Sequence, residues 1–105
     1  MRSFSGIVVV AILATFPGSL AIGQAGADTY KTKCMMCHSA DGSGSSPAGK
    51  AIGAIPFSSP ALIKASDADL IAATTNGKGK MPAYSGKLTS AQIKAVVAYI
   101  RTLQK

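Results

Sequence analysis

The sequence of 105 residues contains no tryptophan, no glutamate, a single histidine and only two cysteines. A structural zinc site needs four ligands, and one histidine with two cysteines supplies three at most. Sustained alternation of apolar and polar residues is also absent, which argues against a β-sheet. Neither an internal repeat nor a linker divides the chain, and its length suffices for one domain. These absences leave a single small domain without strands as the expected architecture.

The first residues have the composition of a secretory signal peptide. Arg2 precedes an uninterrupted apolar run from Gly6 to Phe16, Pro17-Gly18 breaks this run, and small residues dominate up to Ala27. An uncleaved membrane anchor is the alternative, but a spanning helix needs about 20 apolar residues and this run is shorter. The order of basic head, apolar body and small-residue tail therefore favours cleavage.

We expect residues 1–23 to be the signal peptide, cleaved somewhere within residues 21–27, and residues 24–105 to form the mature domain. The protein is then periplasmic or otherwise exported. A mature domain of about 80 residues is near the size at which a hydrophobic core alone is marginal and a staple is needed. A disulfide between Cys34 and Cys37 would close too small a loop to serve as that staple.

Basic residues outnumber acidic ones by eleven to four, so the chain carries a formal charge of +7. A basic surface can bind nucleic acid, an anionic membrane or an acidic protein. Export argues against nucleic acid, and no run of four consecutive Lys or Arg marks a membrane patch. An acidic protein face is the remaining partner, with membrane contact only if the signal segment is retained.

Three helical segments are predicted. The first covers about residues 26–37. The second follows Ser66, a plausible N-cap, and stops before Gly77. The third begins after Thr89, which forms a T-x-x-Q capping box with Gln92. Its apolar residues recur at helical spacing: Ile93, Val96, Val97, Ile100 and Leu103.

The remainder is predicted as loop, mainly residues 39–49 and 76–86. Irregular stretches of this length are uncommon in so small a domain. They become reasonable if they wrap a bulky cofactor. The loops and the missing staple therefore point to the same conclusion, that a bound group completes the fold.

The residues that carry chemistry are Cys34-Met35-Met36-Cys37-His38. In C-x-x-C-H, two thiols at this spacing reach the two vinyl groups of a haem and form thioethers, and the adjacent histidine falls beneath the iron. The motif therefore predicts one covalently bound haem c, attached through Cys34 and Cys37 and ligated by His38. Such an attachment would also be the staple that the domain needs.

Three other interpretations remain open for this motif. A thioredoxin-like redox pair also uses C-x-x-C, but it expects a βαβ context and a nucleophilic thiol. A zinc site would lack ligands, and His38 directly after Cys37 is poorly placed to share a metal with it. A chance match within a structural helix is the third. Haem attachment is favoured over all of them.

A six-coordinate haem needs a second axial ligand, and the lone histidine excludes a second imidazole from this chain. Met1 leaves with the signal, and Met35 and Met36 lie inside the attachment loop on the proximal side. Met81 remains, in the sequence N-G-K-G-K-M-P. A lone methionine is often core filler, but a position in a Gly-flanked loop before Pro82 favours a ligand. We expect His38 and Met81 to ligate the iron.

Taken together, these residues resemble the class I c-type cytochromes, specifically the small bacterial monohaem type. The resemblance covers the whole mature chain. Gly26, Tyr30 and Cys34 match the first-helix G-x-x-x-[FY]-x-x-x-C pattern of that family, and Tyr99 matches the aromatic of its C-terminal helix. The resemblance implies an all-α class I cytochrome c fold, with three to four short helices and long loops around one haem. It also implies that helices cross closely at Gly26 and that the carbonyl of Pro47 accepts the N–H of His38.

With both axial positions filled, no site is open to a substrate. The expected function is one-electron Fe(II)/Fe(III) cycling by an exported carrier, not an enzyme, that is monomeric and docks acidic redox partners. Residues expected to line the haem pocket are Ile52, Ile55, Phe57, Leu62, Ile71, Tyr84, Leu88 and Val97. Lysines expected to steer the partner are Lys31, Lys33, Lys78, Lys80 and Lys87.

Two alternatives to the free carrier stay open. The chain could be a tightly bound cytochrome c subunit of an oxidase or dehydrogenase complex. It could also be a haem enzyme or gas sensor, if Met81 is not a stable ligand.

Overall fold

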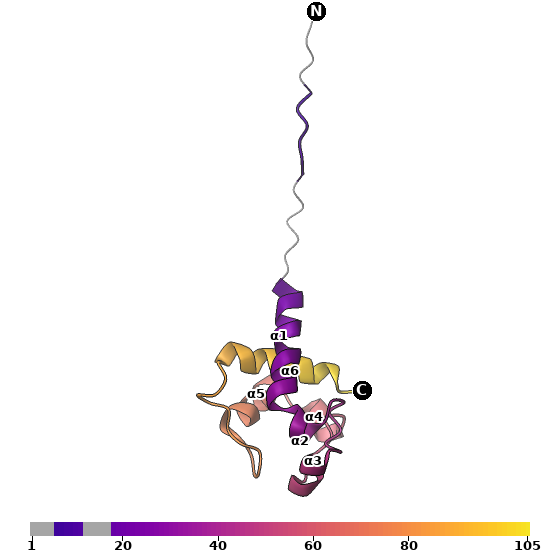
Figure 1. Cartoon of the computed structure of the whole chain (residues 1–105), viewed down its shortest axis with the longest axis vertical. Coiled ribbons are helices and arrows are strands. Elements are labelled where there is room, and N and C mark those ends of the chain that lie inside the picture. The colour runs from indigo at the N-terminus through magenta and orange to yellow at the C-terminus, as the bar shows by residue number, and fades with distance from the viewer. Residues whose placement is uncertain (1–5, 12–17) are drawn as a thin grey trace, which may run out of the picture.

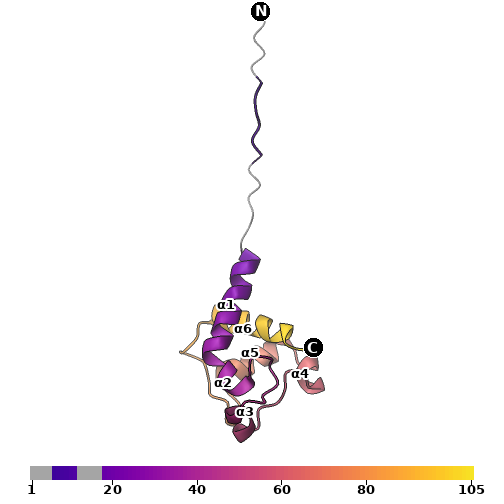
Figure 2. The ribbon, with the colours of Figure 1, turned by 45° about the vertical axis from the view of Figure 1, so that its right-hand side comes forward.

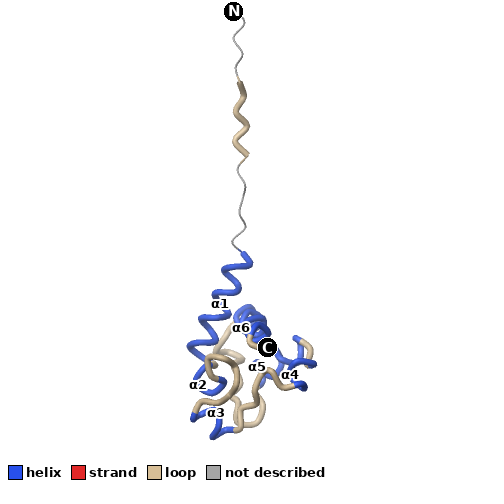
Figure 3. The backbone as a smooth tube through the Cα atoms, turned by 90° about the vertical axis from the view of Figure 1, so that its right-hand side faces the viewer, coloured by secondary structure: helices blue, strands red, loops and turns tan. Residues whose placement is uncertain are grey.

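The structure, a computed structural model, describes residues 6–11 and 18–105. Its helices are α1 (Gly18–Lys33), α2 (Met35–His38), α3 (Pro47–Ile52), α4 (Pro60–Lys64), α5 (Asp67–Asn76) and α6 (Ser90–Thr102). Within the described residues no strand is formed, and only isolated bridges pair Lys78 with Met81 and Ser85 with Leu88 (Figure 3). The all-α fold class is confirmed.

Helix α1 crosses α6, and this crossing is the centre of the fold (Figure 1). Gly26 makes the close approach possible, because a Cβ at this position would collide with the carbonyl oxygen of Ala95 and lie 3.2 Å from the Cβ of Tyr99. The rings of Tyr30 and Tyr99 pack beside it with centroids 5.2 Å apart. The close crossing expected at Gly26 is present.

The N-terminal end of α1 extends further than the sequence indicated. The helix begins at Gly18 rather than near Gly26, and it ends at Lys33, so Cys34 separates it from α2. No helix in the described part of the chain is both long enough and apolar enough to cross a membrane. The predicted signal peptide lies partly outside the described residues, since residues 1–5 and 12–17 are not among them.

The two predicted caps of the C-terminal half are both formed. Ser66 caps α5 by accepting a hydrogen bond from the N–H of Asp69 at 3.0 Å. Thr89 and Gln92 form the reciprocal capping box of α6, with bonds of 3.1 and 2.8 Å. These local signals were readable because each cap satisfies amides of its own helix.

Two short helices, α3 and α4, arise where the sequence indicated loop. Both begin with proline at their first position after a serine, Ser46 before Pro47 and Ser59 before Pro60. Proline is preorganised for a helix start, because its φ is fixed and its missing N–H would have no helical partner there. Figures 1 and 2 both show α3 beyond α2, at the end of the fold away from the start of α1, and α2 packs on α3.

The core is small. Its buried cluster consists of Tyr30, Cys34, Phe57, Val96 and Ile100, with Leu62, Tyr99 and Leu103 packed against it. Of the eight residues expected to line the haem pocket, only Phe57 and Val97 are buried by the protein itself, and Ile55 is 59% exposed. Much apolar surface therefore remains for a bound group to cover.

Candidate functional site

Cys34, Cys37 and His38 lie around one helical turn that begins where α1 ends. The backbone N–H of Cys34 still donates to the carbonyl of Tyr30 at 2.9 Å, so Cys34 continues the path of α1. Its own carbonyl accepts the N–H groups of Cys37 at 3.2 Å and of His38 at 3.0 Å. The turn therefore holds both thiols and the imidazole in one short, hydrogen-bonded segment.

Both cysteines are free thiols; Cys34 is buried and Cys37 half-buried. Burial, and secondarily the neighbouring Cys37, raises the pKa of Cys34 to about 11. This thiol is therefore protonated at neutral pH and lacks the thiolate that a thioredoxin-like nucleophile needs. The pair is available for thioether formation.

The imidazole of His38 is half-buried and stacks on the ring of Phe57, with centroids 4.7 Å apart and planes 23° apart. Burial lowers the pKa of His38, which favours the neutral ring that binds a metal. Its Nδ1 atom is buried without a hydrogen-bond partner. Phe57 was expected only as a pocket wall, and its contact with the candidate ligand is closer than the sequence indicated.

The hydrogen bond expected between His38 and the carbonyl of Pro47 is not formed, and that expectation was wrong. Pro47 is the first residue of α3, and a carbonyl in a first helical turn points along the axis toward the amides of the next turn. The loop is held by the residue before Pro47 instead.

Ser46 fastens the attachment turn to α3. Its hydroxyl donates to the carbonyl of Met36 at 2.7 Å and accepts the N–H of Gly49 at 3.1 Å, which caps α3. Its own N–H donates to the hydroxyl of Ser39 at 2.9 Å. Gly49 lies so close to the carbonyl of Cys37 that any side chain there would collide. The sequence signal for Ser46 was the Ser-Pro pair, which predicts an N-cap.

Met81 lies on the loop that follows α5. Gly77 ends the helix with φ of 75°, and a Cβ there would lie 2.7 Å from the carbonyl oxygen of Met81. Lys78 and Met81 exchange two backbone hydrogen bonds, of 3.2 and 3.0 Å, which close a tight turn. Met81 is half-buried, unlike Met36 of the attachment turn, which is 79% exposed.

The side chain of Tyr84 connects the Met81 loop to the attachment segment. Its hydroxyl donates at 2.8 Å to the carbonyl of Lys33, the residue directly before Cys34. The structure thus brings the loop that carries Met81 to the segment that carries Cys34, Cys37 and His38.

The lysines expected to steer a partner are all exposed: Lys31, Lys33, Lys78, Lys80 and Lys87. They lie on the last turns of α1 and on the loop around Met81. The ammonium group of Lys87 lies 5.8 Å from the centre of the Tyr84 ring. Positive charge therefore lies beside both the segment of Cys34, Cys37 and His38 and the loop of Met81.

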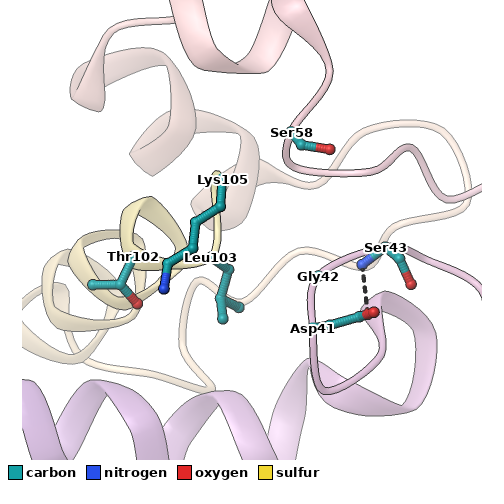
Figure 4. A pocket seen from close by; sticks show the side chains of 7 residues that line it. All are labelled: Asp41, Gly42, Ser43, Ser58, Thr102, Leu103 and Lys105. Atoms are coloured by element: carbon teal, nitrogen blue, oxygen red, sulfur yellow. Dashed lines mark hydrogen bonds between the residues drawn. The ribbon is translucent and has the colours of Figure 1, made fainter.

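A pocket lies in another part of the described fold. It has a volume of about 440 Å³ and is lined by Asp41, Gly42, Ser43, Ser58, Thr102, Leu103 and Lys105 (Figure 4). None of the four candidate residues lines it. Over residues 6–11 and 18–105, no three His, Cys, Asp or Glu side chains are grouped to hold a metal ion.

The residues present fit a covalently attached haem. Two free thiols and a neutral imidazole share one turn, a half-buried thioether lies on a separate loop, and the surrounding apolar side chains are incompletely covered. A flat, apolar macrocycle with an iron centre is complementary to that set.

Comparison with known proteins identifies similar chains. The sequence model of the family described as "Cytochrome C oxidase, cbb3-type, subunit III" matches residues 21–100. Cytochrome c6 of Leptolyngbya boryana is 34% identical over 76% of this chain and 91% of its own length. The cbb3-type cytochrome c oxidase subunit CcoP of Azospirillum brasilense is also 34% identical, over 79% of this chain, but the match spans only 29% of that subunit.

A solved structure has the same fold. The KustC0563 c-type cytochrome superposes with a TM-score of 0.70 and 30% identity, over 76% of this chain and 98% of its own. The matched region contains Cys34, Cys37, His38 and Met81, since all four lie within residues 21–100.

Proposed function

The chain belongs to the family of cbb3-type cytochrome c oxidase subunit III, among the small monohaem c-type cytochromes, and we propose that it is an exported carrier of single electrons. The observation that carries the proposal is the turn of Cys34, Cys37 and His38, with free thiols and a neutral ring at the end of α1. The cytochrome c6 of Leptolyngbya boryana, of which this chain covers 91%, supports a free carrier.

The residues of this chain have distinct roles in the proposal. Cys34 and Cys37 would hold the haem through thioethers, and His38 and Met81 would supply the side-chain ligands of its iron. When bound, the haem supplies reversible one-electron exchange between Fe(II) and Fe(III). Methionine ligation favours the reduced iron and raises the potential relative to a second histidine.

The protein around the haem keeps water away and holds the ligands in place. Phe57 stacks on His38, and the rest of the predicted pocket wall contributes apolar surface. With His38 and Met81 both as ligands, the iron would have no coordination site left for a substrate. The exposed lysines near both ligand segments attract an acidic partner and orient it toward the haem.

A second candidate function is a bound electron-entry subunit of an oxidase. The family description and the CcoP relative favour it, although the chain spans 29% of that relative's length. Purification separates the two functions: a monomer supports the free carrier, and a stable complex with an oxidase supports the subunit.

Carbon monoxide binding tests the role of Met81. We expect the reduced wild-type holoprotein to give a low-spin spectrum that carbon monoxide does not change, because Met81 blocks the iron. Met81→Leu removes the ligand and should bind carbon monoxide readily. Met36→Leu is the matched control, since Met36 is exposed, and it should behave as wild type. Ready binding by wild type would contradict the Met81 assignment and favour a haem enzyme or gas sensor.

A further inference from the structure

Tyr84 joins the Met81 loop to two helices by hydrogen bonds. Its backbone N–H donates to the carbonyl of Thr74 at 3.1 Å, near the C-terminal end of α5. Its hydroxyl donates to the carbonyl of Lys33 at 2.8 Å, at the C-terminal end of α1. The two acceptors are far apart in sequence, and Tyr84 is only three residues beyond Met81.

The acceptor at Lys33 is one that the helix leaves free. The last carbonyls of an α-helix have no partner within the helix. Here the chain turns at Cys34, and in the described part of the chain the N–H of Cys37 donates to Cys34 rather than to Lys33. The tyrosine hydroxyl therefore donates to a carbonyl that the helix leaves available, which gives the contact a defined partner and direction.

Backbone hydrogen bonds hold the loop on both sides of Met81. The Lys78–Met81 turn is closed by two hydrogen bonds, and Ser85 donates to the carbonyl of Thr75 at 3.0 Å. Met81 is thus enclosed between a closed turn and the anchored Tyr84. The side-chain bond from Tyr84 to Lys33 joins this anchored loop to the segment that carries Cys34.

We propose that Tyr84 is a positioning residue for Met81, which fixes the distance between the Met81 loop and the haem-attachment turn through its hydrogen bond to Lys33. The proposal rests on the function proposed above, in which Met81 ligates the iron. Without the hydroxyl, the loop is free to move away from the attachment turn, and Met81 leaves the iron more often. The ring still packs in place, so folding is retained.

Imidazole binding to the oxidised holoprotein measures this effect, because imidazole occupies the iron only when Met81 leaves it. Tyr84→Phe removes the hydroxyl and keeps the ring. Loss of one neutral hydrogen bond of this kind should raise the affinity of the oxidised holoprotein for imidazole about three- to tenfold. The charge-transfer band of methionine-ligated ferric haem should weaken in the same variant.

Tyr99→Phe is the matched control, since its ring packs on Tyr30 at the helix crossing and its hydroxyl makes no hydrogen bond to the residues that the structure describes. It should bind imidazole as wild type does. Free energies of unfolding for both variants show whether a change in affinity exceeds any general loss of stability.

Two results would overturn the inference, and they differ in what they imply. If wild type shows the methionine band and Tyr84→Phe binds imidazole no better, Tyr84 does not position Met81, while the proposed function stands. If wild type itself lacks the band and binds imidazole tightly, the proposed ligation fails as well.

Discussion

Tyr30 is one of the two largest fully buried side chains, and its hydroxyl donates to the carbonyl of Ser39 directly after the attachment turn. Ser39 has φ of 70° and ψ of 162°, a positive-φ conformation that is populated mainly by glycine and costs another residue about 1–3 kcal/mol. The tyrosine bond and the Ser39 hydroxyl bond to Ser46 offset that cost. A buried residue of α1 thus stabilises the exit of the chain from the candidate site.

Replacing Tyr30 by phenylalanine should destabilise the protein by about 1–2 kcal/mol, because the partly buried carbonyl of Ser39 loses its donor. Denaturant unfolding of the holoprotein at neutral pH measures this loss. Stability equal to wild type would show that the Ser39 carbonyl finds another partner.

Tyr30 should also make the free energy of unfolding depend on pH in the alkaline range. Burial raises the pKa of Tyr30 well above its ordinary value of 10.0. Its contribution is therefore complete below about pH 10 and is lost as the pH rises from there, since the unfolded chain releases the proton first. Between about pH 9 and about pH 11, wild type should lose more unfolding free energy than Tyr30→Phe. Parallel profiles would contradict this.

At the scale of elements, helices with local signals were predictable and those that depend on tertiary contacts were not. Ser66 and Thr89 cap α5 and α6 as expected, because these bonds close within a few residues. The separation of α1 from α2 at Cys34 has no local signal. It reflects the turn that presents the cysteines and the histidine. The helices α3 and α4 were expected to be loop, although the Ser-Pro pair before each is a local signal for a helix start.

The same division applies to the candidate site. Cys34, Cys37, His38 and Met81 could be selected from the sequence because their chemistry is specific, and the comparisons support the family. The contacts that surround them could not be predicted. Phe57 on His38 and Tyr84 on Lys33 join residues 19 and 51 positions apart, and such pairs follow from packing rather than from local pattern.

Ser46 and Ser59 offer a matched pair for testing what holds α3. Both precede a proline, but only Ser46 makes a side-chain cap and binds the carbonyl of Met36. Ser46→Ala should cost about 1–2 kcal/mol of unfolding free energy. Ser59→Ala should be neutral or stabilising, since its buried hydroxyl has no partner. Equal effects, measured by denaturant unfolding, would show that the Ser46 bonds contribute nothing specific.

At the scale of the whole molecule, the positive charge should control how fast redox partners are met. The chain carries a formal charge of +7, and its lysines accompany both ligand segments. In the proposed carrier, this charge lies on the side of the molecule's surface that would meet an acidic partner. Attraction between unlike charges speeds such encounters, and salt screens it.

Oxidation of the reduced protein by hexacyanoferrate(III), a trivalent anion, should therefore slow about tenfold or more between about 0.01 and 1 M ionic strength. The double substitution Lys78→Gln, Lys80→Gln on the Met81 loop should reduce this dependence. Lys64→Gln, Lys94→Gln removes the same charge from helices α4 and α6 and should reduce it less. Stopped-flow rates that do not vary with salt would rule out steering.

The mass of the mature protein under denaturing conditions tests whether haem is attached through Cys34 and Cys37, because only a covalently attached group survives unfolding. The account predicts the mass of a chain that begins within residues 22–28 plus one haem, and loss of the haem mass in the Cys34→Ser, Cys37→Ser variant. A wild-type mass equal to that of the polypeptide alone would contradict haem attachment and with it the proposed electron carrier.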